Sequence, residues 1–267
     1  GETFRDHNRH PVQRLTTSGI LAVSSNTGTI KIGETMSNET LYKYLTKFGI
    51  GSKTGSGLPG ESAGLLRKVS DWSGTTAPTV AFGQGYSVTA MQATSVFAAI
   101  ANNGVRVSPT VIAGTSDAAG KFTPTAAQSS TRVISEDTAR KLRLMMETVV
   151  APGGTAPSAI IPGYRVAGKT GTASRYDDAT GRYSGYTASF IGFAPADEPR
   201  YVISVTLQDP RNGYYGGVLG GPVFKKVMSF VLQSQHVAPT GTKIVPVALN
   251  QRELTRARAQ QTSLVKE

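Results

Sequence analysis

Three extended segments that follow one another in the second half of the chain constrain its fold most. Residues 188–194 and 201–207 are apolar runs of strand length, and residues 195–199, which begin and end with proline, form a short connection between them. Residues 164–173 form a third extended segment upstream. Because short connections join antiparallel strands, the sequence predicts a three-stranded antiparallel meander.

Helical patterns surround this predicted sheet in the sequence. Apolar residues at helical spacing predict helices over 39–48, with Asn38 as cap, over 89–102, and from Ser135 to about residue 151. Another helix is predicted from about Pro222, a residue typical of a first helical turn. Residues 252–261 are weakly helical, and 105–131 are expected to be a short extended piece and a surface loop. The fold class is therefore α/β (α+β), an antiparallel sheet flanked by helices.

Composition argues against several classes of function. The chain has 28 Lys and Arg against 17 Asp and Glu, a net charge of +11, but the positive residues are scattered over its 267 positions. A nucleic-acid partner is therefore not expected. There is no cysteine and the three histidines lack metal-binding spacing, so we predict no metal site and no cofactor. No stretch approaches the roughly 18 apolar residues that a membrane-spanning helix needs.

The first extended segment carries the residues Lys169-Thr170-Gly171-Thr172. With a glycine at 163, the letters also match a phosphate-binding loop, Gly-x4-Gly-Lys-Thr. Such a loop lies between a buried strand and a helix, whereas the residues before 163 are loop-like and those after 172 are rich in turn formers. We therefore reject a nucleotide site. The segment is interpreted as a strand that offers a compact cation, hydroxyls and backbone N–H groups to a ligand.

A second polar cluster, Ser24-Ser25-Asn26, directly follows the apolar run 19–23. The two clusters resemble the Ser-x-Asn and Lys-Thr-Gly signatures of penicillin-binding proteins and serine β-lactamases. Further motifs, in the expected order over about residues 3–235, are similar to the transpeptidase domain of class B penicillin-binding proteins, with the cell-division type closest. They are Phe48-Gly49-Ile50-Gly51, Gly57-Leu58-Pro59-Gly60-Glu61, Phe82-Gly83-Gln84-Gly85-Tyr86, Val88-Thr89-Ala90-Met91-Gln92 and Gly154-Thr155-Ala156.

The resemblance implies the penicillin-binding and serine β-lactamase-like fold. It also implies a peptidoglycan D,D-transpeptidase that cross-links stem peptides through a serine acyl-enzyme in septal wall synthesis, and that is a target of β-lactams. Lys169, Thr170, Gly171 and Thr172 would bind the substrate and its terminal carboxylate. The backbone N–H of Thr172 would be one of two donors of the oxyanion hole.

The same resemblance gives catalytic roles to Ser24 and Asn26, beside Lys169 and Thr172. Ser24 would pass a proton to the leaving group, between Lys169 and the lysine of the nucleophile motif. Asn26 would hold that lysine and the substrate amide. The alternative is that both residues only cap a helix, because serine and asparagine favour helix caps.

The nucleophile is expected to be missing from these residues. The family carries it in a first signature, Ser-x-x-Lys, upstream of Ser-x-Asn. The only Ser-x-x-Lys here is Ser263-Leu264-Val265-Lys266, after both other motifs, and we reject it. We expect residues 1–235 to be a partial transpeptidase domain truncated at its N-terminal side, 236–267 to be a polar tail, and the chain alone to be inactive. The strand 201–207 should then have an open edge.

The resemblance also implies partners and a location. The partners are a peptidoglycan stem peptide ending in D-Ala-D-Ala, β-lactam antibiotics, divisome membrane proteins and the N-terminal part of the same protein. The location is the extracytoplasmic face of the bacterial cell membrane, with the anchor outside this chain. Two other functions stay open: a β-lactam-binding relative that is a carboxypeptidase, a β-lactamase or a sensor domain, and a non-catalytic binding or scaffold module.

Overall fold

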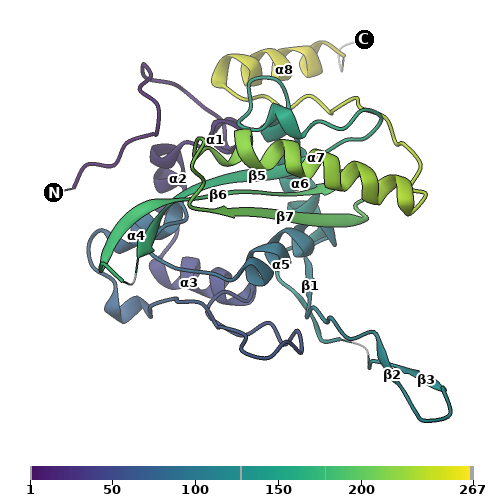
Figure 1. The fold of residues 1–267 in the computed structure, drawn as a ribbon. Coiled ribbons are helices and arrows are strands. Elements are labelled where there is room, and N and C mark those ends of the chain that lie inside the picture. The colour runs from purple at the N-terminus through teal and green to yellow at the C-terminus, as the bar shows by residue number, and fades with distance from the viewer. Residues whose placement is uncertain (1, 127, 178, 265–267) are drawn as a thin grey trace.

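A three-stranded antiparallel sheet in the order β5-β6-β7 forms the centre of the molecule (Figure 1). β5 (Ala167–Asp177) pairs with β6 (Arg182–Ala194), which pairs in turn with β7 (Tyr201–Gln208). The predicted meander is therefore confirmed, and residues 169–172 lie on an edge strand. The structure is a computed structural model, and the residues it describes are 2–126, 128–177 and 179–264.

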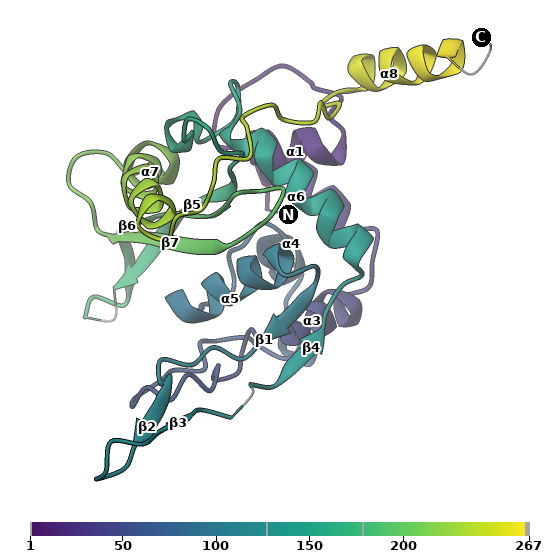
Figure 2. The same cartoon turned by 90° about the vertical axis from the view of Figure 1, so that its right-hand side faces the viewer.

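Helices cover both faces of this sheet. Figure 2 shows α7 on one side and α5 and α6 on the other. On the α7 side Phe190 of β6 packs edge-on against Phe224, and on the other side Phe193 packs with Ile100 and Met146. The α-helices are α1 (Thr17–Val23), α2 (Asn26–Gly33), α3 (Asn38–Lys47), α4 (Thr76–Ala81), α5 (Ala90–Ala101), α6 (Glu136–Val150), α7 (Gly216–Ser234) and α8 (Gln251–Leu264), and the 3-10 helices are η1 (Val69–Asp71) and η2 (Pro157–Ala159).

β7 forms the second edge of the sheet. Among the described residues it pairs with β6 alone, as the sequence predicted. Its two faces are covered: Val205 is buried in the cluster that includes α7, and Val202 packs on the opposite side. The open edge is therefore a row of backbone donors and acceptors between two covered faces.

The start of α7 differs from the prediction. The helix begins at Gly216, and Pro222 lies inside it instead of in its first turn. The extra turns fit because glycines let the helix lie directly on the sheet. A Cβ on Gly216 would lie 2.2 Å from the carbonyl oxygen of Ser189 and 2.3 Å from that of Gly171. A pattern of apolar side chains could not reveal this contact, because backbone atoms make it.

Other elements were incompletely predicted. Ser37, and not Asn38, caps α3, since its hydroxyl accepts from the backbone of Thr40. Thr89 caps α5 in a capping box with Gln92. The expected loop over 105–131 contains two small antiparallel sheets, and Figure 1 shows one of them at the end of a projecting arm. Their strands are β1 (Val105–Val107), β2 (Gly114–Ser116), β3 (Phe122–Pro124) and β4 (Ser130–Arg132).

The polar C-terminal tail begins as a segment that packs on the body. Tyr164 donates its hydroxyl proton to the carbonyl of Val237 at 2.6 Å, and Gly241 N–H donates to the carbonyl of Gly163 at 3.0 Å. Beyond residue 250, α8 projects from the body (Figure 2). Within the described residues, no helix combines the length and apolar character needed to cross a membrane.

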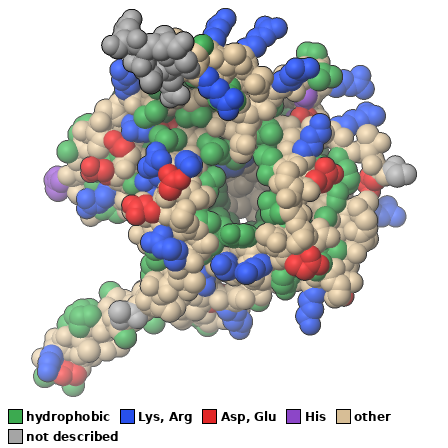
Figure 3. Space-filling model, turned by 180° about the vertical axis from the view of Figure 1, so that it is seen from behind, with side chains coloured by type: hydrophobic (Ala, Val, Ile, Leu, Met, Phe, Trp, Pro, Cys, Tyr) green, Lys and Arg blue, Asp and Glu red, His purple; other side chains and the backbone are tan. Residues whose placement is uncertain are grey.

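The face opposite to Figure 1 shows how the charge is distributed. Lys and Arg side chains are spread over it among acidic and uncharged residues, without one continuous basic block (Figure 3). The same face is hollowed near its centre, and hydrophobic side chains border the hollow.

Candidate active site

The fold brings the two polar clusters together at the edge of the sheet. Lys169 Nζ, on β5, donates a hydrogen bond to Ser24 Oγ at 2.7 Å, across 145 positions of sequence. β5 reaches Ser24 because α1, which ends at Val23, packs against α6, and α6 packs against β5. A cation and a hydroxyl from two separate motifs are thus in direct contact.

Ser24 has an unusual backbone that directs its hydroxyl. It ends α1 in the left-handed conformation, with φ 57° and ψ 49°, although it is not glycine. Such residues are uncommon outside glycine and asparagine and are found disproportionately at functional sites. The conformation lets α1 stop and α2 begin two residues later, with Ser25 as cap of α2. Ser24 thus caps the end of α1 through its backbone N–H while its hydroxyl contacts Lys169, and the N-cap of α2 is Ser25, not Asn26.

The amine of Lys169 is enclosed and has only neutral partners. Besides Ser24, it donates to the carbonyl oxygen of Thr170 at 3.0 Å. Burial lowers the pKa of Lys169 from 10.5 to about 8. No carboxylate among the described residues forms an ion pair with it. An anionic group placed beside this amine would favour its charged form, so the site is suited to an anion.

The threonines of the segment alternate with Lys169 along β5, because side chains alternate along a strand, and the Lys169 amine still reaches the Thr170 hydroxyl at 3.5 Å. Thr172 is exposed, and its hydroxyl oxygen accepts a hydrogen bond from the N–H of Gly216, at the start of α7, at 3.1 Å. This leaves the hydroxyl proton of Thr172 free to donate to a ligand. The hydroxyl of Thr170 lies 2.9 Å from that of Thr155. Gly171 leaves room beside Ser189, whose Oγ would lie 2.5 Å from an added Cβ.

Asn26 is not brought into contact with Lys169. It is the first residue of α2, and its side-chain N–H donates to the carbonyl of Arg5 at 3.2 Å. The N-terminal segment thus accepts a hydrogen bond from one N–H of the amide that the sequence assigned to the site. The same segment continues to the start of α7, where His7 Nε2 lies 2.7 Å from the hydroxyl of Tyr215.

Asp6 fastens this segment to the start of α2. Its carboxylate accepts from the backbone N–H of Thr27 at 2.8 Å, from Ser25 Oγ at 2.7 Å and from His10 Nε2 at 2.9 Å. Burial raises the pKa of Asp6, but the hydrogen bonds from Thr27, Ser25 and His10 outweigh it, so the pKa lies below the ordinary 3.8. A negative charge at a helix N-terminus is also favoured by the helix dipole.

We expect Asp6→Ala to lower the free energy of unfolding at pH 7 by about 1.5–3 kcal/mol, because four donors lose a charged acceptor: the N–H and the hydroxyl of Thr27, the hydroxyl of Ser25 and the ring of His10. Since the folded-state pKa is lowered, this stability is present above pH 3.8 and is lost as pH falls further. Urea unfolding at pH 7 and pH 3 measures it. The exposed Glu2→Ala is the control, and an equal loss at both pH values would contradict the assignment.

The sequence motifs do not indicate two contacts of the site. Thr155, in the motif Gly154-Thr155-Ala156, was recognised as part of the resemblance but received no role, and it contacts Thr170. Gly216 received none because a backbone N–H leaves no trace in a sequence pattern. The rejected motif from Ser263 to Lys266 extends beyond the described residues, because Lys266 lies outside them.

Comparisons with known proteins identify the family of the chain. The family model "Penicillin binding protein transpeptidase domain" matches residues 1–229. The chain is 40% identical to the penicillin-binding protein PbpB of Mycolicibacterium smegmatis over 247 residues, which is 89% of this chain and 38% of that protein. It is 36% identical to the peptidoglycan D,D-transpeptidase FtsI of Escherichia coli, over 97% of this chain and 43% of that protein.

Solved structures show the same similarity in three dimensions. Penicillin-binding protein 3 of Mycobacterium tuberculosis, complexed with ampicillin, has a TM-score of 0.85 and 37% identity, covering 92% of this chain and 56% of that chain. A peptidoglycan synthetase of Bifidobacterium adolescentis also has a TM-score of 0.85, at 36% identity, covering 94% of this chain and 45% of that one.

The chain therefore belongs to the penicillin-binding protein transpeptidase family. Its relatives PbpB, FtsI and PenA identify the class B branch that the sequence motifs resembled. The chain spans less than half the length of these curated relatives.

Proposed function

We propose that this chain is the part of a peptidoglycan D,D-transpeptidase that binds the D-Ala end of a stem peptide during wall cross-linking. The observation that carries the proposal is the hydrogen bond of 2.7 Å between Lys169 Nζ and Ser24 Oγ, which joins the two motifs. Cross-linking through a serine acyl-enzyme requires a serine nucleophile, and we propose that it comes from sequence outside residues 1–267. The chain alone is then inactive.

Each residue of the site has a proposed role. Lys169 provides positive charge for the substrate carboxylate, and the free proton of Thr172 donates to the same group. The backbone N–H of Thr172 stabilises the oxyanion of the tetrahedral intermediate. Ser24, in contact with Lys169, relays a proton to the leaving group.

Asn26 and the remainder of the segment 169–172 complete the proposed site. Thr170 and Gly171 allow the substrate to lie along the β5 edge. The Thr170 hydroxyl is hydrogen-bonded to Thr155, and Gly171 has no side chain. Asn26 binds the substrate amide and the lysine of the nucleophile motif through its Oδ1 and second N–H, because the carbonyl of Arg5 accepts from one N–H only.

The ligands, location and domain limits belong to the same proposal. The M. tuberculosis relative has been crystallised with aztreonam and with ampicillin, which supports β-lactams as ligands of this site. By analogy with FtsI, we propose action at the extracytoplasmic face of the membrane, with divisome proteins as partners. The end of the family match at residue 229 and the end of α7 at Ser234 support a transpeptidase domain that ends near residue 235.

Titration with acetyl-D-Ala-D-Ala, followed by NMR of the backbone amides of residues 170–172, tests carboxylate binding without a nucleophile. We expect chemical shifts that change with peptide concentration. The affinity for the peptide should fall by about tenfold as the pH rises past about 8, because Lys169 loses its charge there. Acetyl-L-Ala-L-Ala is the matched control ligand. Shifts that are identical for both peptides, or insensitive to this pH change, would contradict the proposal.

A further inference from the structure

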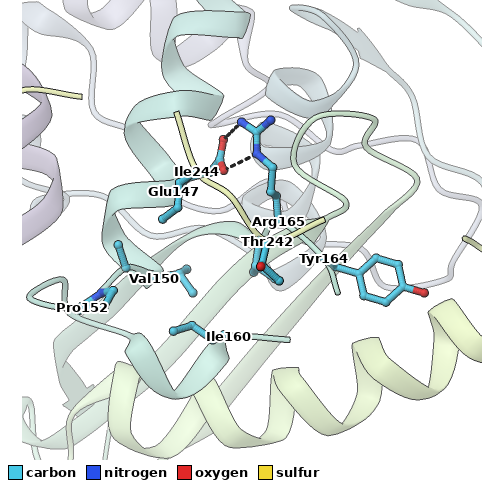
Figure 4. Close-up of a pocket in the computed structure, with 10 residues that line it drawn as sticks. Glu147, Val150, Pro152, Ile160, Tyr164, Arg165, Thr242 and Ile244 are labelled. Carbon is cyan, nitrogen blue, oxygen red and sulfur yellow. Dashed lines mark hydrogen bonds and ion pairs between the residues drawn. The ribbon is translucent and has the colours of Figure 1, made fainter. Parts of the chain in front are cut away.

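A buried ion pair fastens the start of β5 to α6. Arg165 donates from Nε to Glu147 Oε2 at 2.8 Å and from Nη2 to Oε1 at 2.6 Å, so the contact is bidentate. The Glu147 side chain is 1% exposed and that of Arg165 is 14% exposed. Figure 4 shows the pair beside a cavity lined mainly by apolar residues of α6, the β5 entry and the tail. Paired hydrogen bonds of this kind fix orientation as well as distance.

The backbone between Arg165 and Lys169 is held in place by hydrogen bonds and close packing. The carbonyl of Arg165 accepts from Ala196 N–H at 2.8 Å, and Ala167 is completely buried. At Gly168, an added Cβ would lie 2.5 Å from the ring of Phe190, so the backbone is already in close contact with β6. A displacement of Arg165 is therefore passed on to Lys169, four residues further along.

α6 also supports the other side of the site. α1 packs on α6 with Ser18 and Ala22 buried, and it ends next to Ser24. The other ion pairs formed by α6 in the described part of the chain join Asp137 to Arg140 and Lys141 on the exposed surface of the same helix. Glu147 is thus the charged residue through which α6 holds β5 while its packing holds α1.

We propose that Glu147 and Arg165 are positioning residues that set how deeply the amine of Lys169 lies against Ser24. Neither residue contacts Lys169, so neither is catalytic. An apolar pair of similar volume would preserve packing but would not fix the direction of approach. The effect of this ion pair on substrate binding rests on the proposed function. The effect on how deeply the Lys169 amine is buried does not.

The test compares the double variant Glu147→Leu/Arg165→Met with the unchanged chain. The measurement is the pH dependence of Lys169 acetylation by acetic anhydride, quantified by mass spectrometry, which gives the pKa of this amine. The groups facing it are the hydroxyl of Ser24 and the carbonyl and hydroxyl of Thr170, all neutral. Its pKa therefore reports burial. We expect the midpoint to rise from about 8 by about one pH unit or more.

Asp137→Asn, on the same helix, is the matched control and should leave the midpoint unchanged. A folded double variant with an unchanged midpoint would overturn the proposal. If the double variant does not fold, Arg165→Lys replaces it in the test. This variant keeps the positive charge but loses the bidentate hydrogen bonds of the guanidinium. An unchanged midpoint in Arg165→Lys also overturns the proposal. The same samples are titrated with acetyl-D-Ala-D-Ala. Failure of the unchanged chain to bind this peptide would count against the proposed function and leave the midpoint comparison intact.

Discussion

Lys169→Ala in the full-length protein is expected to slow acylation by a fluorescent penicillin by about 100- to 10,000-fold, the range typical for loss of a group that positions or transfers a proton. The variant removes the cation for the ligand carboxylate and the partner of the Ser24 hydroxyl at the same time. The second-order rate constant of labelling, measured from gel fluorescence against time, gives the effect.

The chain contains a matched control for this experiment. Lys53 belongs to a second Lys-Thr-Gly triplet, residues 53–55, but it is exposed in a loop. Lys53→Ala should therefore label at the rate of the unchanged protein. Equal rates for Lys169→Ala and Lys53→Ala would show that the position of the lysine in the fold is irrelevant, contrary to the site described above.

Arg165→Met alone is expected to reduce the free energy of unfolding by about 3–5 kcal/mol, because it leaves the Glu147 carboxylate buried at 1% exposure without its partner. Urea denaturation of the 267-residue chain measures this loss. The effect should far exceed that of Asp137→Asn, whose ion pairs lie on the surface.

The double variant Glu147→Leu/Arg165→Met separates two explanations of that loss. If the single variant is unstable because a charge is stranded, removing both charges should recover most of the stability. A double variant as unstable as Arg165→Met would instead attribute the loss to packing of the arginine stem. The stability measurement also shows which variant is folded and can be used to titrate the Lys169 amine.

The buried half of β6 and all of β7 were predictable because these strands are apolar and a short turn separates them, whereas residues 174–177 and 182–187, which are rich in turn formers, also belong to β5 and β6. The helices with regular apolar spacing, α3, α5 and α6, were also predictable. The start of α7 was not: glycines bury backbone against backbone, and Gly216 lies close to the carbonyls of Ser189 and Gly171. The arm that contains β2 and β3 was also missed. Its strands are short and largely exposed, so they have no apolar alternation to detect.

The structure brings Ser24 and Lys169 into contact, as the motifs predicted, whereas other contacts of the candidate site were not predicted. The motifs indicated that Ser24 and Lys169 belong together. The left-handed backbone of Ser24 and its packing partner α6 are tertiary features that no local pattern encodes. The contact between Asn26 and the carbonyl of Arg5 could not be predicted either. Every residue has a backbone carbonyl, so the sequence does not indicate which one accepts the hydrogen bond.

Labelling by a fluorescent penicillin tests the central claim most directly, when the 267-residue chain and the full-length protein are compared under the same conditions. We predict covalent labelling of the full-length protein at a serine outside residues 1–267, and none of the chain alone. Covalent labelling of the chain alone, mapped by mass spectrometry to one of its own serines, would contradict the claim that these residues bind the substrate while the nucleophile lies elsewhere.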